Sequence, residues 1–256
     1  MKKNSISAVI ITKNSAACLP RCLRCLDFTD EIIVVDSESS DETVKIARSH
    51  KAHVYVKKFA GYGKNKNFGI SKAKGAWVLS VDSDEYVSDT LREELLGKIS
   101  GSREADGYYI TRRNYFYGKW LRFGGQYPDY HMRLFRKGKG LFDLSAVHEG
   151  LRLKGRSARL RGWLIHDSKP TVERHISDIN LYTGLETEKK PAKKEKPFYY
   201  RVLFKPVLYF VKNYFFKMGF LDGAGGFIFH VNSAMYLFIT AVKKLEKKGG
   251  PGKSGR

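Results

Sequence analysis

The chain has 256 residues, 42% of them apolar and 13% aromatic, which is enough for one folded domain with a sizeable core and an appendage. This composition excludes an intrinsically disordered protein. Lys and Arg number 47 against 26 Asp and Glu, a net charge of +21, so we expect an anionic partner: nucleic acid, an acidic membrane surface or a phosphorylated substrate.

Short apolar runs alternate with longer segments of helical spacing over the first 82 residues. This alternation predicts βαβ units and a parallel sheet. The expected strands are residues 6–12, 31–36, 52–58 and 76–82, and the expected helices are residues 15–28, 40–50 and 63–75.

The alternation stops after position 100. Residues 106–118 and 130–138 have the pattern of strands without crossover helices, so we expect the sheet to become mixed. Residues 171–190 can form an amphipathic helix, and residues 191–197 form a short basic linker. Residues 198–220 mix aromatic side chains with Lys and Arg, and Pro206 is placed to open a helix.

Polar residues follow three of the expected strands. Thr12 and Asn14 follow the first strand, Asp36 ends the second, and Asp82 and Asp84 follow the fourth. In an open α/β sheet, ligands bind beyond the carboxyl ends of the strands, so these side chains predict a binding site. The Asp-x-Asp spacing alone is weak evidence, and its alternative interpretation is a cap of the following helix.

Several motifs together resemble the inverting glycosyltransferases of family 2. They are VIITKN, EIIVVDSESSDET, GYGKNKNFGI, WVLSVDSDE, YHMRLFRKG, VHEGL, HDS and FLDGAGG, and they cover nearly the whole chain. The likeness is closest to the bacterial branch that adds glucose to the inner core of lipopolysaccharide. It implies an α/β GT-A fold, with a Rossmann-like nucleotide-binding half, a mixed central sheet and a helical, membrane-associating extension.

The implied domain boundaries follow from this resemblance. Residues 1–168 would form the catalytic domain, divided into a nucleotide-sugar half (1–100) and an acceptor half (101–168). Residues 169–248 would form the helical extension, and residues 249–256 a disordered tail.

The resemblance also implies roles for the strand-end residues. Asp36 would bind the uracil edge of a UDP-sugar, and Thr12 and Asn14 would line the base and ribose. Asp82 would lie near the ribose or the metal, and Asp84 would bind Mg²⁺ or Mn²⁺ that bridges the two phosphates. We therefore expect the clustered acids to be neutralised by a divalent ion.

Two further donor contacts are implied on the third helix. Lys66 and Asn67 correspond to a basic-polar pair near the donor. Ser15 departs from the family pattern, which often has an acid after TKN.

The acceptor half would carry the general base. An inverting reaction needs one base to take a proton from the acceptor hydroxyl, and the resemblance points to Glu149, next to His148 in the substrate site. Asp129 is the second candidate for the base. Arg133 would contact phosphate or hold Glu149.

His166 corresponds to a histidine that completes the metal site in the family. A structural role for a histidine at the end of an apolar strand is the alternative.

Three cysteines offer a competing interpretation. Cys18, Cys22 and Cys25 have the C-x3-C-x2-C spacing that holds an iron–sulfur cluster in radical SAM enzymes. The same spacing places them on one face of a helix, where thiols pack as small apolar groups. We favour packing, and three free thiols without a secretory signal fit a reducing, cytoplasmic compartment.

The basic, aromatic C-terminal part predicts contact with an anionic membrane, or else a helix pair that caps the core. The apolar window at residues 227–242 contains His230 and Asn232 and is shorter than a spanning helix needs. We therefore expect a peripheral protein on the cytoplasmic face of the bacterial inner membrane. No nucleic-acid-binding signature is present, so we expect no nucleic-acid partner.

The sequence thus predicts metal-dependent transfer of a sugar from a UDP donor, UDP-glucose above all, to a lipid-linked or phosphorylated glycan such as the lipopolysaccharide inner core. The alternatives are transfer to polyprenyl phosphate or another glycolipid, a non-catalytic nucleotide-sugar-binding membrane adaptor, and a radical SAM enzyme.

Overall fold

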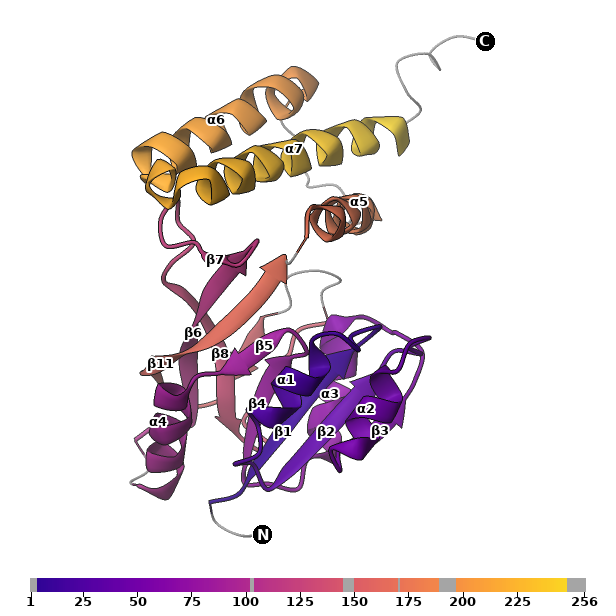
Figure 1. Ribbon diagram of the computed structural model, residues 1–256, viewed down its shortest axis with the longest axis vertical. Coiled ribbons are helices and arrows are strands. Elements are labelled where there is room, and N and C mark those ends of the chain that lie inside the picture. Colours follow the sequence, from indigo (N-terminus) through magenta and orange to yellow (C-terminus); the bar gives the residue numbers. More distant parts are fainter. Residues whose placement is uncertain (1–3, 102–103, 145–149, 170, 189–196, 248–256) are drawn as a thin grey trace. The chain divides into compact units, whose positions relative to one another are not determined.

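The computed structural model describes residues 4–101, 104–144, 150–169, 171–188 and 197–247 (Figure 1). The chain divides into two compact units, one of residues 1–113 with 129–166 and one of residues 114–128 with 167–256. We call them the sheet unit and the helical unit. Strands β6 and β11 run from one unit into the other.

The sheet unit contains most of the strands and four helices. Its strands are β1 (Ile6–Thr12), β2 (Glu31–Asp36), β3 (His53–Val56), β4 (Trp77–Asp82), β5 (Glu85–Val87), β6 (Gly107–Phe116), β8 (Asp129–Arg136), β9 (Gly140–Phe142), β10 (Leu151–Leu153) and β11 (Ser157–Lys169). Its helices are α1 (Leu19–Arg24), α2 (Thr43–Ser49), α3 (Tyr62–Lys72) and α4 (Asp89–Ser100).

The central sheet is mixed, as the sequence predicts. Its order is β3-β2-β1-β4-β8-β6-β11-β5, with β7 paired to β6. Strands β1 to β4 pair in parallel, whereas β8 is antiparallel to β4 and β6 is antiparallel to β8. The expected α/β class, with a Rossmann-like first half, a mixed central sheet and a helical C-terminal part, is confirmed.

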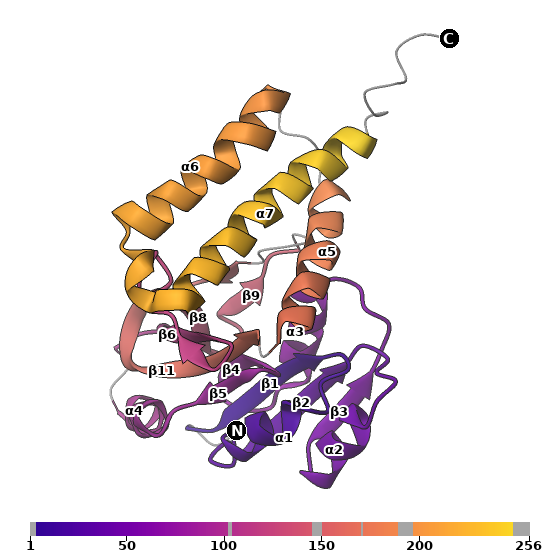
Figure 2. The same ribbon diagram turned by 45° about the horizontal axis from the view of Figure 1, so that its top comes forward.

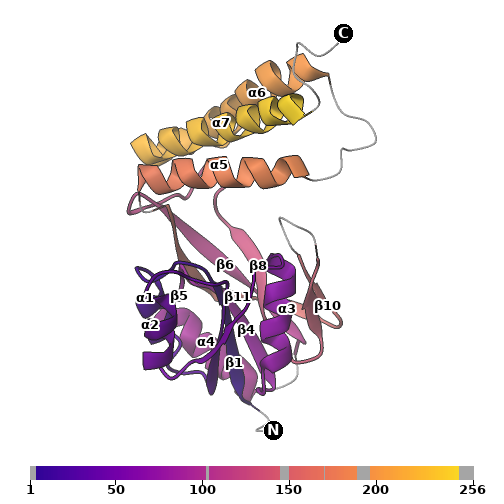
Figure 3. The ribbon, with the colours of Figure 1, turned by 90° about the vertical axis from the view of Figure 1, so that its right-hand side faces the viewer.

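Helices cover both faces of the sheet (Figure 3). On one face, the buried side chains of α1, α2 and α4 pack in one cluster with alternate residues of β1 and β4. On the other face, Val9 and Val35 pack against α3 and β9. Gly69 of α3 lies so close to Val9 that an added Cβ would be 2.5 Å from its Cγ1 atom, so a residue without a side chain lets this helix approach the sheet.

Helix α1 is shorter than the predicted helix over residues 15–28. The segment before it is held as a loop, because Asn14 has a φ angle of 49° and the backbone amide of Ser15 donates to the Thr43 hydroxyl at 2.8 Å. Pro20 then occupies the first helical turn, where its missing amide costs nothing. The chain N-terminal to α1 therefore adopts a loop after β1, although its side-chain pattern is helical.

The helical unit contains β7 (Lys119–Trp120) and the helices that follow β11. These are α5 (Val172–Glu188), α6 (Lys205–Val211) and α7 (Gly223–Lys247), with π-helical turns η1 (Tyr200–Phe204) and η2 (Lys212–Phe216) and a 3₁₀ turn η3 (Gly219–Asp222). Helix α7 lies alongside both α5 and α6 (Figure 2). We call residues 198–247 the α6–α7 hairpin and residues 212–222 its tip. Most of the predicted linker, and the predicted tail, lie outside the described residues.

The tip of the hairpin is tied to the loop around β7. Asp222 is buried, and its carboxylate accepts hydrogen bonds from the backbone amides of Arg122 and Phe123 at 2.9–3.1 Å. The ring of His230 packs against Gly124 and Gly219, where a Cβ atom would lie within 2.5 Å of its Nε2 atom. The FLDGAGG motif therefore forms a tight junction within this unit.

The apolar stretch in the C-terminal part is longer than the window at residues 227–242 predicts. Within the described residues, the segment Gly219–Lys247 is long and apolar enough to cross a membrane by length and composition, although such a helix is weak evidence by itself. The shorter window at residues 227–242 missed it because it counted His230 and Asn232 as interruptions. In the structure His230 is fully buried and Asn232 is partly buried, so they interrupt the helix in sequence but not its exposed apolar side.

Candidate functional site

The carboxyl ends of β1, β2 and β4 bring the predicted polar residues to one edge of the sheet. Thr12 pairs in register with Asp36, and Asp82 pairs with Ile11, one residue earlier on β1. Such register follows from the parallel pairing of three adjacent strands, and it places the two acidic strand ends on either side of β1.

The β1–β2 side of this edge is a closed network of loop contacts. The carboxylate of Asp36 is fully buried and accepts hydrogen bonds from the backbone amide of Ser39, at 2.9 Å, and from its hydroxyl. Asn14 fixes the same loop, because its side-chain oxygen accepts a hydrogen bond from the Ser40 amide at 2.9 Å. The hydroxyl of Thr12 is buried and finds no hydrogen-bond partner among the described residues, so a ligand atom could complete it.

The β4 side carries the acidic turn, and its charges are compensated by cations of the protein. Asp82 pairs through one oxygen with Lys66 at 3.0 Å and through the other with Arg133 at 2.8 Å. Glu85 is fully buried and pairs with Arg133 and, at 3.4 Å, with Arg112. Three basic side chains thus compensate the charges of Asp82 and Glu85, while the expected role of Asp82 near a divalent ion stays a prediction.

The electrostatics of this pairing are visible in the pKa values. Burial by itself would raise the pKa of Asp82, but Arg133 and Lys66 outweigh it and hold that pKa well below its usual range. Arg133 is almost fully buried, and its two carboxylate partners raise the pKa of its guanidinium in spite of burial. Ion pairs this deep are fixed in geometry, because a member without its partner would be a buried charge.

Asp84 stands apart from the other two acids. Its side chain is 39% exposed, and its carboxylate lies 3.5 Å from Nε2 of His166. Burial by itself would raise the pKa of Asp84, but His166 outweighs it and lowers that pKa. The sequence singled out both residues as metal ligands, and the structure brings them together from the β4–β5 turn and from β11.

This pair fits a divalent cation in part. A carboxylate and an imidazole 3.5 Å apart can share one ion, and Mg²⁺ or Mn²⁺ usually takes its other ligands from water and substrate phosphates. Among the described residues no group of three His, Cys, Asp or Glu side chains could hold a metal. Asp82 is paired with Lys66 and Arg133 through its two oxygens, and each of these oxygens keeps a further lone pair.

Asp129 lies at the start of β8, beside the same network. Nε and Nη2 of Arg112 donate to one carboxylate oxygen at 2.9 and 2.7 Å, and Nε2 of His131 lies 2.8 Å from the other. Burial would raise the pKa of Asp129, but His131 and Arg112 together lower it strongly. A carboxylate held in its charged form is a weak proton acceptor, so this environment argues against Asp129 as general base.

Of the two predicted donor contacts on α3, Asn67 lies away from the sheet edge and Lys66 reaches it, whereas the two predicted acceptor-site residues lie outside the described residues. Asn67 of α3 donates to the backbone oxygen of Phe142 at 2.9 Å and accepts from its amide at 2.8 Å, so the amide fastens β9 to α3. The ammonium group of Lys66 reaches the sheet edge, where it pairs with the Asp82 carboxylate. His148 and Glu149 are not among the described residues.

The three cysteines pack beneath the acidic turn. Cys22 is fully buried and its thiol donates to the backbone oxygen of Asp82 at 3.7 Å, while the sulfur of Cys25 accepts from the Val87 amide at 3.2 Å. Burial raises the pKa of all three thiols, including Cys18, above the ordinary value. Cluster ligands must be thiolates, so this environment favours the packing role over an iron–sulfur site.

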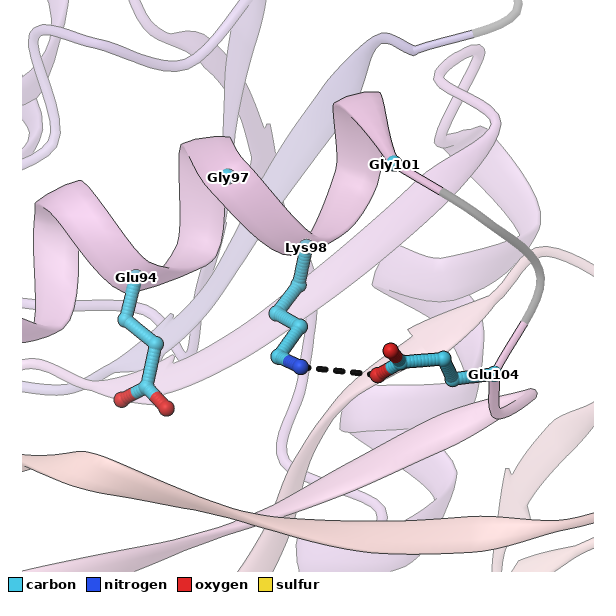
Figure 4. Close-up of a pocket in the computed structure, with 5 residues that line it drawn as sticks. All are labelled: Glu94, Gly97, Lys98, Gly101 and Glu104. Atoms are coloured by element: carbon cyan, nitrogen blue, oxygen red, sulfur yellow. Dashed lines mark hydrogen bonds and ion pairs between the residues drawn. The ribbon is translucent and has the colours of Figure 1, made fainter.

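A shallow pocket of about 390 Å³ lies elsewhere, along the C-terminal half of α4 (Figure 4). Lys98 and Glu104 pair with one another across it at 2.7 Å. The carboxylate of Glu94 accepts hydrogen bonds from the backbone amides of Arg161 and Gly162. Because its charges are already paired, this pocket does not compete with the sheet edge as the functional site.

The network contains residues to which the sequence analysis gave no role. Glu85 follows Asp82 and Asp84 in the motif WVLSVDSDE, but the sequence does not indicate which cations pair with it. Arg112 and His131 lie on β6 and β8, and only the antiparallel pairing of these strands, with Arg112 opposite Asp129, brings them to the acids.

Comparisons with known proteins decide the family. The model of the family described as Glycosyl transferase family 2 matches residues 7–154. The lipopolysaccharide core biosynthesis glycosyltransferase LpsC of Rhizobium meliloti is 32% identical over 248 residues, covering 94% of this chain and 92% of that protein. The chain belongs to glycosyltransferase family 2.

Other proteins are similar to this family 2 glycosyltransferase over most of its length. The uncharacterized glycosyltransferase RP128 of Rickettsia prowazekii is 30% identical and covers 95% of this chain and 87% of its own. Among solved structures, that of Staphylococcus aureus TarS, residues 1–349 in complex with UDP, matches with a TM-score of 0.47 and 15% identity, covering 98% of this chain and 94% of that one. The resemblance seen in the sequence is thus confirmed at the level of the family.

Proposed function

We propose that this enzyme is an inverting glycosyltransferase that moves a sugar, glucose in our expectation, from a UDP donor to a lipid-linked glycan such as the lipopolysaccharide inner core. The observation that carries the proposal is the sheet edge, where the buried Asp36 carboxylate, proposed to bind the base, and the partly buried Asp84–His166 pair, proposed to bind a cation, lie on either side of β1. The similarity to LpsC, a lipopolysaccharide core biosynthesis glycosyltransferase that matches over nearly the whole length of both chains, supports an acceptor in the lipopolysaccharide core.

The donor base is assigned to the β1–β2 side. Asp36 offers a buried carboxylate held in place by Ser39, which suits it to accept a hydrogen bond from the imide N–H of uracil. The unpartnered hydroxyl of Thr12 lies beside it in register, and Asn14 shapes the loop that would cover the ribose. A site built to satisfy buried polar groups rejects bases that leave them unpaired.

The donor diphosphate is assigned to the β4 side. Asp84 and His166 would hold Mg²⁺ or Mn²⁺, which supplies positive charge to the departing nucleoside diphosphate when bound. Asp82 is proposed as a positioning residue, because it fixes the ammonium group of Lys66 and the guanidinium of Arg133 at this edge. These cations add to the positive field that a diphosphate would meet.

The general base is assigned to Glu149, with His148 beside it in the acceptor site. The lowered pKa of Asp129 argues against the alternative and gives that residue a structural role with Arg112. The acceptor, being lipid-linked, would be met at the cytoplasmic face of the inner membrane. Residues 1–168 would supply the catalytic domain and residues 169–248 the membrane-facing extension.

The proposal is tested by donor binding and by transfer. We expect UDP with Mn²⁺ to raise the melting temperature of the full-length enzyme more than either alone, because only the ternary combination fills both sides of the edge. Asp84→Asn should abolish that synergy and lower sugar transfer by more than about 100-fold. Because the Asp84 side chain is 39% exposed and its ion pair with His166 is long, at 3.5 Å, the free energy of unfolding of the variant should stay within about 1 kcal/mol of the parent.

Asp27→Asn is the matched control, since Asp27 is an exposed acid that pairs with Arg92 on the surface. It should leave both binding and transfer unchanged. Full metal-dependent transfer by Asp84→Asn would overturn the site assignment. Transfer to polyprenyl phosphate, with none to a core oligosaccharide on lipid A, would keep the donor site and replace the acceptor.

A further inference from the structure

The helical unit carries a large set of exposed apolar side chains. Phe216 is 80% exposed and Val207 is 61% exposed, and each of the other side chains in the set keeps more than a third of its surface exposed. The exposed set on the α6–α7 hairpin is Tyr199, Leu203, Phe204, Val207, Leu208, Phe215, Phe216, Met218, Phe220, Leu221, Phe227, Ile228, Val231, Met235, Phe238 and Val242. Soluble proteins seldom leave so many large apolar groups together in water, so this surface calls for a partner.

The set is ordered along the hairpin. On α7 the exposed residues Phe227, Val231, Phe238 and Val242 recur at steps of four, seven and four, which is one stripe of a helix. Before and along α6, the exposed apolar residues form two adjacent pairs four positions apart, which are Leu203 with Phe204 and Val207 with Leu208. The tip joins the two stripes with five exposed apolar residues among positions 215–221. The apolar surface is therefore continuous along the chain from one helix to the other.

The charge of the hairpin selects an anionic partner over a second copy of the chain. Residues 198–247 contain seven Lys and Arg against two acids, and one of these acids, Asp222, is buried in its contacts with residues 122 and 123. Lys205, Lys212 and Lys217 are exposed between the apolar side chains. Two such surfaces would repel each other, whereas long lysine side chains can reach lipid phosphates while aromatic rings enter the headgroup layer.

The contacts between α5 and α7 decide the orientation. Asn232 of α7 donates to Nδ1 of His175 at 3.1 Å, and Nζ of Lys243 donates to Asn180 and Thr183 of α5 at 2.7–2.9 Å. These contacts hold the two helices together over roughly 16 Å of their length, since 11 residues separate Asn232 from Lys243. If α7 crossed a bilayer, α5 would enter it as well.

Helix α5 is unsuited to a hydrocarbon environment. Glu173 and Arg174 are exposed on it, and Asp178 pairs with Arg174 at 3.3 Å. Charged groups at bilayer depth are costly, so the helix pair is stable only with α5 on the aqueous side. The same argument excludes α7 as a membrane span, although its length and composition allow one.

We propose that the α6–α7 hairpin docks in the plane of an anionic lipid bilayer, with the tip and the two apolar stripes in the headgroup layer and α5 in water. The lipid partner is recognised by phosphate charge and an apolar interior. This interaction does not depend on the donor site, so it stands or falls separately from the proposed sugar transfer.

The test is flotation of the full-length protein with vesicles of phosphatidylglycerol and phosphatidylethanolamine. We expect strong binding at low salt, weaker binding at about 1 M salt, and little binding to phosphatidylcholine vesicles. The variant Val207→Ser with Phe216→Ser should bind at least about tenfold more weakly, because it removes two side chains that would be buried in lipid. Replacing Lys205, Lys212 and Lys217 by Gln should weaken binding by roughly fivefold per lysine.

The matched control is Val56→Ser with Leu96→Ser, which removes two exposed apolar side chains of the sheet unit. It should bind vesicles as the parent does. Thermal stabilisation by UDP and Mn²⁺, measured on every variant, separates membrane docking from the donor site and reports folding. Equal flotation of the hairpin variant and the parent would overturn the proposal. Resistance of bound protein to alkaline carbonate would overturn the in-plane orientation, because it would indicate a spanning helix.

Discussion

In the sheet unit, acids and cations meet inside the protein and neutralise one another, whereas in the helical unit large apolar side chains face outward. Arg133 lies between Asp82 and Glu85 with little exposure, and its charge is used within the chain. Phe216 lies at the hairpin tip with most of its surface in water. In the sheet unit, Asp82, Glu85, Lys66, Arg112 and Arg133 pair with one another and form an ionic frame beside the proposed ligand site. In the helical unit, the exposed apolar side chains have no such partners within the described residues, and we propose that lipid covers them.

The most severe way to break this contrast is to remove the central cation of the frame. Arg133→Met should lower the free energy of unfolding by about 3–5 kcal/mol, because the fully buried charge of Glu85 would keep only the longer contact to Arg112 among these cations, and Asp82 would keep only Lys66. Urea unfolding of the purified variant measures this loss. The double variant Arg133→Met with Glu85→Gln should recover part of it. A loss below about 1 kcal/mol for Arg133→Met would show that the frame is not held by this cation.

Acid separates the two units by the pH range in which each loses stability. Burial lowers the pKa of His230, with a smaller contribution from Lys217 that Asp222 opposes. The unfolded chain therefore takes up a proton below its ordinary value of 6.5 while the folded ring stays neutral. Stability should fall as the pH drops below 6.5, by up to about 1.4 kcal/mol per pH unit.

Asp129 behaves in the opposite part of the pH range. Its folded pKa lies below the ordinary 3.8, so its contribution is present above that pH and is lost only below it. The free energy of unfolding at pH 7 and pH 5 should thus differ in the parent and differ less in His230→Leu. An identical difference in both proteins would remove His230 as the cause.

The smallest expected effect concerns an exposed apolar side chain of the helical unit. Phe216→Ser should change the free energy of unfolding in solution by no more than about 0.5 kcal/mol, since a residue 80% exposed contributes little packing. Thermal unfolding without lipid measures it. A loss above about 2 kcal/mol would mean that this side chain is part of the core and not of an open surface.

Parts of this arrangement were predictable from sequence, and the reason lies in the range of each contact. The parallel strands β1 to β4 and the polar residues at their ends follow from local apolar runs, whereas the register that pairs Thr12 with Asp36 is seen only in the structure. Asp84 and His166 were named together through the family resemblance. The role of Glu85 could not be predicted, because its partners Arg133 and Arg112 come from β8, which is antiparallel to β4, and from β6, the next strand of the sheet, and this strand order leaves no local signal.

Helix boundaries and the C-terminal part were predicted less well for the same reason. The spacing of residues 15–28 is helical, but hydrogen bonds from the backbone amides of Asn14 and Ser15, to Ser39 in the loop after β2 and to Thr43 at the start of α2, hold this segment as a loop. His230 and Asn232 interrupt the apolar pattern of α7 in sequence, while tertiary packing turns both away from the exposed stripe.

The hydrogen bonds from α7 to α5 bear on how the enzyme is best handled in the laboratory. Shortening the chain before residue 198 to gain solubility would leave His175, a buried residue, without the amide of Asn232, and Asn180 without the ammonium group of Lys243. Such a fragment would be damaged in its fold, and it would also lack the surface that we propose docks on lipid. Mild detergents or nanodiscs, with the whole chain retained, are therefore the better route to an active preparation.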